Sequence, residues 1–120
     1  MPKILVIDDE SNLRNVMKCN LIASGYIVTT AENGEEGLKA ARRYKPDLIV
    51  LDVKMPVMSG WDVLTNLRNT PKLRQVPVII ATAYLSPNDE ERTKAVGVCY
   101  LAKPFNVSEL LAQVKEALGE

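Results

Sequence analysis

Apolar runs alternate with amphipathic segments along the chain. Five runs have the length of strands, at residues 3–8, 26–31, 47–52, 76–82 and 99–103. Three of them are nearly continuous in valine, isoleucine and leucine, a pattern typical of parallel strands that helices cover on both faces of a sheet. The pattern therefore predicts a five-stranded parallel sheet between two layers of helices.

The segments between these runs have helical periodicity, with helix start and stop signals. The first carries a row of residues at helical spacing on one face, namely Leu13, Val16, Met17, Leu21 and Ser24. Arg14 falls on the polar face, and Gly25 marks the end of this helix. Ser86 and Asn106 stand where the N-caps of the last two helices belong.

A strand followed by a helix, five times over, predicts right-handed crossovers and an α/β fold. The 120 residues, 47% of them hydrophobic, suffice for one compact domain, and we expect residues 1–120 to form it. Lysine plus arginine number 15, as do aspartate plus glutamate, so the net charge of zero argues against nucleic acid or an anionic membrane as a partner. Because the sequence shows no signal peptide and no apolar stretch of membrane-spanning length, we expect a cytoplasmic protein.

The two cysteines, Cys19 and Cys99, are too few and too far apart for a disulfide framework or a zinc site. No metal-ligand spacing surrounds either of them. We expect both to be buried thiols in the reduced state.

Charged and hydroxyl side chains stand where the predicted strands end. The first strand ends in Asp8 and Asp9, the third in Asp52, the fourth in Thr82 and the fifth in Lys103. Because the carboxyl ends of parallel strands form one edge of a sheet, these groups are expected to converge there. Three converging carboxylates repel one another unless a hard cation such as Mg²⁺ lies among them. Acids, metal, hydroxyl and amine together indicate phosphoryl transfer.

Each of these residues has a simpler explanation when it is taken alone. An aspartate at a strand end, such as Asp9, is commonly a helix N-cap, and one before a turn, such as Asp52, is usually a turn residue. Thr82 alone would be an ordinary strand residue, and Lys103 a solvated surface lysine. Only their convergence indicates a site.

Four motifs stand in order along the chain: "VIDDES", "LIVLDVKMPVMSG", "IIATAY" and "YLAKPF". By these motifs the chain resembles a response-regulator receiver domain of bacterial two-component systems, in its single-domain, CheY-like form. The resemblance implies a flavodoxin-like, doubly wound fold with strand order 2-1-3-4-5 and five flanking helices. It also implies a signalling switch that catalyses its own aspartyl phosphorylation and dephosphorylation, not an enzyme that turns over a separate substrate.

The resemblance implies that Asp52 accepts a phosphoryl group from the phosphohistidine of a sensor histidine kinase or a histidine phosphotransferase. Mg²⁺, or Mn²⁺ in its place, would be bound by Asp9, Asp52 and the backbone carbonyl of Lys54. Asp8 would act largely through a water molecule. The cation would shield the incoming phosphoryl group from the carboxylates.

The resemblance also implies a set of residues that respond to the phosphoryl group. Lys103 would pair with one phosphoryl oxygen, and Thr82 would move to bind another. In similar domains an aromatic side chain of the fifth strand, here Tyr100, fills the space that the threonine leaves. The face formed by the fourth helix, fifth strand and fifth helix would then change shape for a downstream effector protein. In this family the bond between Lys103 and Pro104 is typically cis.

Lys54 and Tyr84 stand two residues beyond Asp52 and Thr82 and are expected to overhang the phosphoryl site. Bulky side chains there would keep an in-line water molecule away, so we expect a long-lived phosphoryl group. The same pair of residues is similar to that of single-domain intermediates of phosphorelays.

Two other classes of protein fit less well, and one alternative stays open. A haloacid dehalogenase phosphatase places a second aspartate two residues after its nucleophile, where this chain has Glu10 after Asp8 and Lys54 after Asp52. A dinucleotide-binding domain needs a glycine-rich turn after the first strand, and this turn is acidic. The open alternative is a phosphorylation-independent interaction module on the same fold, which would normally have lost an acidic or lysine position.

Overall fold

The computed structural model describes residues 1–83, 85–96 and 98–120. Strands and helices alternate along it: β1 (Lys3–Ile7), α1 (Ser11–Ala23), β2 (Ile27–Ala31), α2 (Gly34–Tyr44), β3 (Leu48–Leu51), α3 (Gly60–Arg68), β4 (Val78–Thr82), α4 (Pro87–Val96), β5 (Cys99–Ala102) and α5 (Val107–Leu118). Each predicted strand is present and is one or two residues shorter than predicted at one or both ends.

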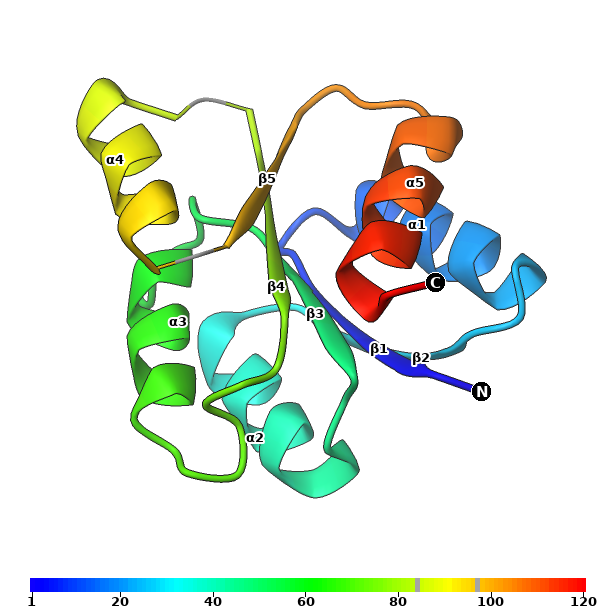
Figure 1. Ribbon diagram of the computed structural model, residues 1–120, viewed down its shortest axis with the longest axis horizontal. Coiled ribbons are helices and arrows are strands. Elements are labelled where there is room, and N and C mark those ends of the chain that lie inside the picture. Colours follow the sequence, from blue (N-terminus) through cyan, green and yellow to red (C-terminus); the bar gives the residue numbers. More distant parts are fainter. Residues whose placement is uncertain (84, 97) are drawn as a thin grey trace.

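All five strands are parallel, in the order β2-β1-β3-β4-β5. The strand order reverses between β1 and β3, which is where open sheets of this kind place their working site. Helices α1 and α5 cover one face of the sheet, and α2, α3 and α4 lie on the other side (Figure 1). The predicted doubly wound α/β fold is confirmed.

The central strands β1, β3 and β4 supply both halves of the hydrophobic core. Successive side chains of a strand point to opposite faces, so Leu5 and Ile7 pack toward α2 and α3 while Ile4 and Val6 pack toward α1 and α5. Every residue of β3 and β4 is buried. This two-sided burial explains why these strands have no alternation of apolar and polar residues.

The structure differs from the predicted burial at several surface positions. Val16 is 51% exposed, because the α1 face that meets the sheet follows Met17 and Leu21, one turn apart. The expectation of buried thiols is wrong: Cys19 lies on the solvent side of α1, and Cys99 begins the edge strand β5. Both cysteines are free.

The predicted helix starts are confirmed by hydrogen bonds. The Ser86 hydroxyl accepts the backbone N–H of Asp89 at 3.1 Å, and Oδ1 of Asn106 accepts that of Glu109 at 2.8 Å. Gly25 follows α1 at φ +96°, a left-handed conformation that favours glycine. Within the described residues, the helices are too short or too polar to cross a membrane.

Candidate active site

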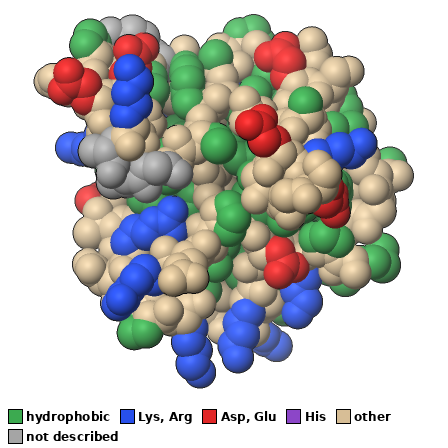
Figure 2. All heavy atoms as spheres, in the orientation of Figure 1, with side chains coloured by type: hydrophobic (Ala, Val, Ile, Leu, Met, Phe, Trp, Pro, Cys, Tyr) green, Lys and Arg blue, Asp and Glu red, His purple; other side chains and the backbone are tan. Residues whose placement is uncertain are grey.

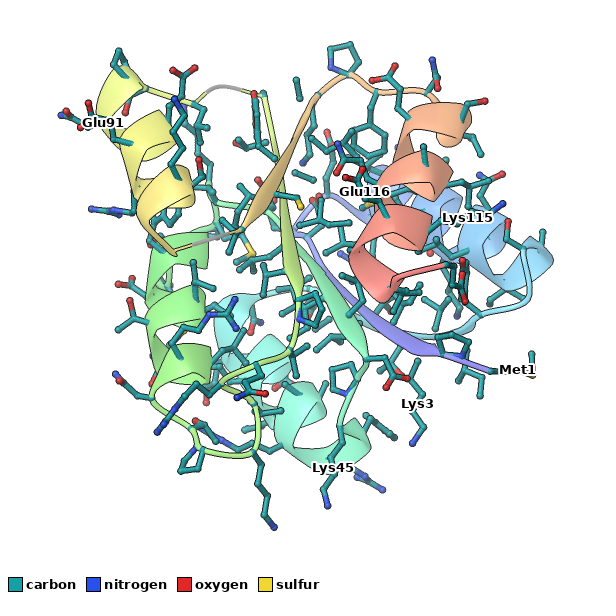
Figure 3. The ribbon with its side chains drawn as sticks, viewed as in Figure 1. Met1, Lys3, Lys45, Glu91, Lys115 and Glu116 are labelled. Atoms are coloured by element: carbon teal, nitrogen blue, oxygen red, sulfur yellow. The ribbon has the colours of Figure 1, made fainter. Side chains whose placement is uncertain are left out.

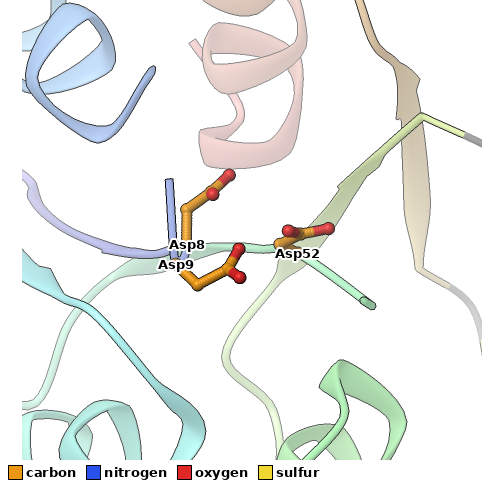
Figure 4. A group of neighbouring side chains, drawn as sticks. All are labelled: Asp8, Asp9 and Asp52. Carbon is orange, nitrogen blue, oxygen red and sulfur yellow. The ribbon is translucent and has the colours of Figure 1, made fainter. Parts of the chain in front are cut away.

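The carboxylates of Asp8, Asp9 and Asp52 meet at the carboxyl edge of β1 and β3 (Figure 4). One oxygen of each lies within 4.8 Å of one oxygen of the others. Ile7 pairs with Leu51 in the parallel register, so the residues that follow the two strands stand side by side. Asp8 and Asp52 are buried, whereas Asp9 is exposed.

Two N–H donors hold the Asp8 carboxylate. Its Oδ1 accepts the backbone N–H of Glu10 at 2.9 Å, and its Oδ2 accepts a hydrogen bond from Nζ of Lys103 at 2.8 Å. The same Nζ lies 3.4 Å from Oδ2 of Asp52. One ammonium therefore bridges two buried carboxylates that come from different strands.

Burial and charge act in opposite directions on these groups. Burial raises the pKa of Asp52 above its ordinary value; Lys103 opposes this increase and the charge of Asp8 adds to it. Burial alone would lower the pKa of Lys103, but the hydrogen bond and charge of Asp8, together with the charge of Asp52, raise it. Lys103 is therefore a fixed cation at neutral pH.

A cavity of about 350 Å³ opens above these carboxylates. It is lined by Asp9, Glu10, Asp52, Lys54, Thr82, Ala83 and Lys103. Thr82 is the last residue of β4 and is only 1% exposed. The backbone N–H of Lys54 donates to Oδ1 of Asp52 at 3.3 Å, which orients the carboxylate in the cavity.

The start of α3 packs directly against the backbone that carries Asp52. A Cβ on Gly60 would collide with the carbonyl oxygen of Asp52, so this position requires glycine for close approach. The backbone N–H of Gly60 donates to the carbonyl of Val53 at 2.8 Å. The side chain of Ser59 caps α3 in a capping box with Asp62.

Arg14 supports the backbone of the site, although the sequence pattern placed it on the polar face of α1. Its Nη1 donates to the backbone carbonyl of Asp8 at 2.8 Å, and its side chain is partly buried. The available signal was its position one helical turn after Glu10, whose carbonyl accepts the Arg14 N–H at 2.9 Å. Helical side chains lean toward the N-terminus, so a long one at this position reaches the preceding turn.

Three further residues named from the sequence, Tyr84, Tyr100 and Pro104, are not among the residues that line this cavity in the described part of the chain. Tyr100 is partly buried and packs against the core cluster on the α2 and α3 side of the sheet. The Lys103–Pro104 peptide bond is cis. Tyr84 lies outside the described residues.

Comparison with known proteins links this site to one family. A family model for the response regulator receiver domain matches residues 4–115. The polar-differentiation response regulator DivK of Brucella anthropi is 38% identical over 122 residues, which cover 100% of this chain and 99% of DivK. The alkaline phosphatase synthesis transcriptional regulatory protein PhoP of Bacillus subtilis is 43% identical over 97% of this chain, which spans 48% of PhoP.

Solved structures give the same result. The chemotaxis protein CheY4 of Vibrio cholerae has a TM-score of 0.92 and 35% identity, over 98% of this chain and 99% of that one. The receiver domain of the sensor histidine kinase PA1611 of Pseudomonas aeruginosa has a TM-score of 0.88 and 31% identity, over 99% of this chain and 98% of that one. That structure has a magnesium ion coordinated in its active site cleft.

Proposed function

Because this chain belongs to the response regulator receiver family, whose members are phosphoacceptor switches of two-component systems, we propose that Asp52 is its phosphoryl acceptor. The observation that carries this assignment is the environment of the Asp52 carboxylate. It is buried, lies beside Nζ of Lys103 and faces a cavity that it shares with Asp9 and Thr82. No other carboxylate among the described residues combines burial, a lysine partner and a place in the wall of this cavity.

The proposed reaction moves one phosphoryl group between two proteins. A carboxylate oxygen of Asp52 attacks the phosphorus of a phosphohistidine, the P–N bond breaks, and the imidazole leaves with a proton while an acyl phosphate forms. Lys103 stabilises the ionised form of Asp52 and stands where it can meet charge on a phosphoryl oxygen. The Thr82 hydroxyl, in the wall of the same cavity, is the proposed donor to a second phosphoryl oxygen.

The donor set fits a hard divalent cation. Three carboxylates within 4.8 Å of one another, one of them exposed, are the oxygen ligands that Mg²⁺ prefers. Asp9, Asp52 and the backbone carbonyl of Lys54 would hold it, and Asp8, whose oxygens already accept two hydrogen bonds, would act through water. The bound cation supplies positive charge against the repulsion between phosphoryl and carboxylate oxygens. Mn²⁺, which accepts the same ligands, would substitute.

The switch is proposed to link Thr82 to Tyr100. Thr82 ends β4, and Tyr100 lies on the neighbouring strand β5, opposite Ile80. Because Tyr100 is partly buried, a turn of its ring would change the exposed surface of β5. The proposed effector-binding face therefore consists of α4, β5 and α5, and the phosphoryl donor is a sensor histidine kinase or a histidine phosphotransferase.

The proposal also covers the type of activity, the excluded partners and the cellular location. The site's groups serve Asp52 of the same chain, so we infer a switch formed by residues 1–120 as one domain and no turnover of a separate substrate. Nucleic acid and membrane are not proposed as partners, because the net charge is zero. The cytoplasm suits two exposed free cysteines, which stay reduced there.

Intact-protein mass spectrometry after incubation with acetyl phosphate tests the acceptor. The wild type should gain one phosphoryl group with Mg²⁺ and lose this gain in EDTA, and Asp52→Asn should gain none. The matched control is Asp47→Asn, a carboxylate at the opposite edge of the sheet, which should behave as the wild type. An unmodified, folded wild type would refute the acceptor and leave the interaction module as the function.

The same assay measures the proposed lifetime of the phosphoryl group. Lys54 is exposed at the rim of the cavity, where its long side chain would keep water from the phosphorus. We expect Lys54→Asn to shorten the half-life of the adduct several-fold, because an amide orients a water molecule. An unchanged half-life would show that Lys54 does not control hydrolysis; Tyr84→Asn tests the second proposed position.

A further inference from the structure

Charge is unevenly distributed over this neutral molecule. Five cations gather at the amino edge of β3 and β4, opposite Asp52, and form what we call the basic edge: Arg42, Arg43, Lys45, Lys72 and Arg74. The first three end α2 and lead into β3, and the other two lie in the loop between α3 and β4. Lysine and arginine side chains crowd the lower margin of the molecule in Figure 2, and Lys45 points outward there in Figure 3.

The cations of the basic edge have no anionic partners in the described part of the chain. All five side chains are exposed, and none forms an ion pair there. Lys39, one turn earlier on α2, does pair with Glu35 and Glu36. The helix dipole accounts for cations at the end of α2, but it does not account for Lys72 and Arg74, which lie in a loop.

The loop that carries Lys72 and Arg74 is fixed by a buried side chain and by two side-chain hydrogen bonds. Leu73, between them, is 2% exposed and anchors the loop in the core. Nη1 of Arg68 donates to the carbonyl oxygens of Arg74 at 2.8 Å and of Val76 at 2.9 Å. The two cations are therefore presented on a fixed backbone, which lowers the entropy lost when a ligand binds.

Lys45 occupies a position where glycine or asparagine is the usual residue. It ends α2 in the left-handed conformation, with φ 48° and ψ 67°. A side chain at such a position destabilises the fold slightly compared with glycine. The lysine adds a cation to the basic edge despite this strain, an outlier of the kind that points to a function.

A groove runs between the two basic segments. Its volume is about 330 Å³, and its walls include Pro46, Pro71, Val76 and Pro77, with Lys72 at the rim. The only carboxylate in these walls is that of Asp47, which accepts the backbone N–H of Lys3 at 2.7 Å. Gln75 also lines the groove, which thus offers proline and valine side chains among polar groups, directly beside exposed cations.

We propose that the basic edge and this groove bind an acidic segment of a partner protein, with an apolar side chain of that segment in the groove. The acidic side chains of the segment complement the five cations. Its apolar side chain can contact the prolines and the valine that line the groove. A nucleic acid or an anionic membrane would use the cations but not the groove, and the zero net charge provides no long-range attraction to such polyanions. Because the site lies at the edge opposite Asp52, a bound partner leaves the acceptor cavity open.

Fluorescence anisotropy tests this proposal with a fluorescein-labelled peptide of alternating glutamate and leucine, at low and physiological salt. The triple variant Lys45→Glu, Lys72→Glu, Arg74→Glu should bind about tenfold or more weakly than the wild type. The control triple variant Asn12→Glu, Asn15→Glu, Lys18→Glu adds negative charge at exposed positions of α1, away from the basic edge and from the proposed effector-binding face, and should bind as the wild type. A peptide with serine in place of leucine should bind more weakly, because it leaves the groove unfilled.

Several results would overturn the proposal. No binding to the wild type at low salt would do so, as would an equal loss in both triple variants, which would show a response to net charge alone. Tighter binding of labelled single-stranded DNA, or of phosphatidylserine-containing vesicles, with the same dependence on the basic edge would assign the site to nucleic acid or membrane instead. Phosphorylation of Asp52 in the basic-edge variant should stay unchanged, which separates this test from that of the proposed acceptor.

Discussion

The two edges of the same sheet carry opposite charges and hold them in different ways. At the carboxyl edge, Asp8 and Asp52 are buried and share the ammonium of Lys103. At the amino edge, cations such as Lys72 and Arg74 are exposed and have no anionic partner in the described residues. The net charge of zero conceals this separation, because it sums the charges of the whole chain without regard to where they lie.

This comparison teaches where charge affects stability. A buried charge depends on its partners, since removal of one partner leaves an uncompensated ion in a poorly solvated place. An exposed charge is solvated with or without a partner and contributes little to folding. Substitutions at the carboxyl edge should therefore change both stability and chemistry, and those of exposed cations at the amino edge should change binding.

The largest effect is expected from Lys103→Met in the absence of divalent cations. This change leaves two buried carboxylates without their cation and should lower the free energy of unfolding by about 3 kcal/mol at neutral pH. Because the charged carboxylates raise the pKa of Lys103 in the folded state, the loss should be constant from neutral pH up to about pH 10, the ordinary lysine pKa, and shrink above it. Urea denaturation at several pH values measures the loss.

Lys18→Met, at an exposed position of α1, is the control for Lys103→Met and should change the free energy of unfolding by less than about 0.5 kcal/mol. Mg²⁺ should stabilise the Lys103→Met protein more than the wild type, because the cation enters an acidic cluster without its lysine. Equal losses in the two variants would contradict the view that Lys103 compensates buried charge.

The second effect concerns the one cation of the amino edge that is partly buried. Arg68→Ala removes the hydrogen bonds to the carbonyls of Arg74 and Val76 and should lower the free energy of unfolding by about 2 kcal/mol. Lys72→Ala, in the same loop, should change it by less than about 0.5 kcal/mol. If both changes cost the same, burial would not distinguish the cations at this edge.

A gain in stability is expected at the acceptor. Burial raises the pKa of Asp52, so the folded state holds its proton more tightly than the unfolded chain, and stability falls as pH rises through this window. Without divalent cations, Asp52→Asn should raise the free energy of unfolding by about 1 kcal/mol at pH 7, a stability that the wild type gives up for function. The gain should vanish below roughly pH 4, the ordinary carboxyl pKa. Urea denaturation at pH 7 and pH 4 measures it, and a gain independent of pH would contradict the electrostatic cause.

The sequence predicted the carboxyl edge well because its information is local. Each strand there is a short apolar run followed at once by a polar residue, so Asp8, Asp52 and Thr82 could be placed from the strand ends alone. Parallel pairing of the strands then brings these ends together, because it aligns the backbones independently of the side chains at the ends. The cap residues Ser86 and Asn106 were predictable for the same reason.

The features that the sequence missed depend on tertiary contacts. The exposure of Cys99 follows from the place of β5 at the edge of the sheet, and the contact of Arg14 with the Asp8 carbonyl follows from how α1 leaves β1. The basic edge joins two segments nearly thirty residues apart, Lys45 and Lys72 among them. Composition gives the number of charges but not their positions. The clustering of these cations at one edge is seen only in the fold.

The smallest effect is expected at Lys45, where the two roles of the amino edge can be separated. Lys45→Gly relieves the left-handed conformation at φ 48° and should raise the free energy of unfolding by about 0.5 to 1 kcal/mol, measured by urea denaturation. The same change removes one cation, so it should weaken binding of the acidic peptide about threefold. Lys72→Gly, in the loop, removes a cation at the same edge without that gain. A glycine variant at Lys45 that is more stable and binds equally well would show that the lysine is merely tolerated there, and the case for the basic edge would then depend on the remaining cations and the groove.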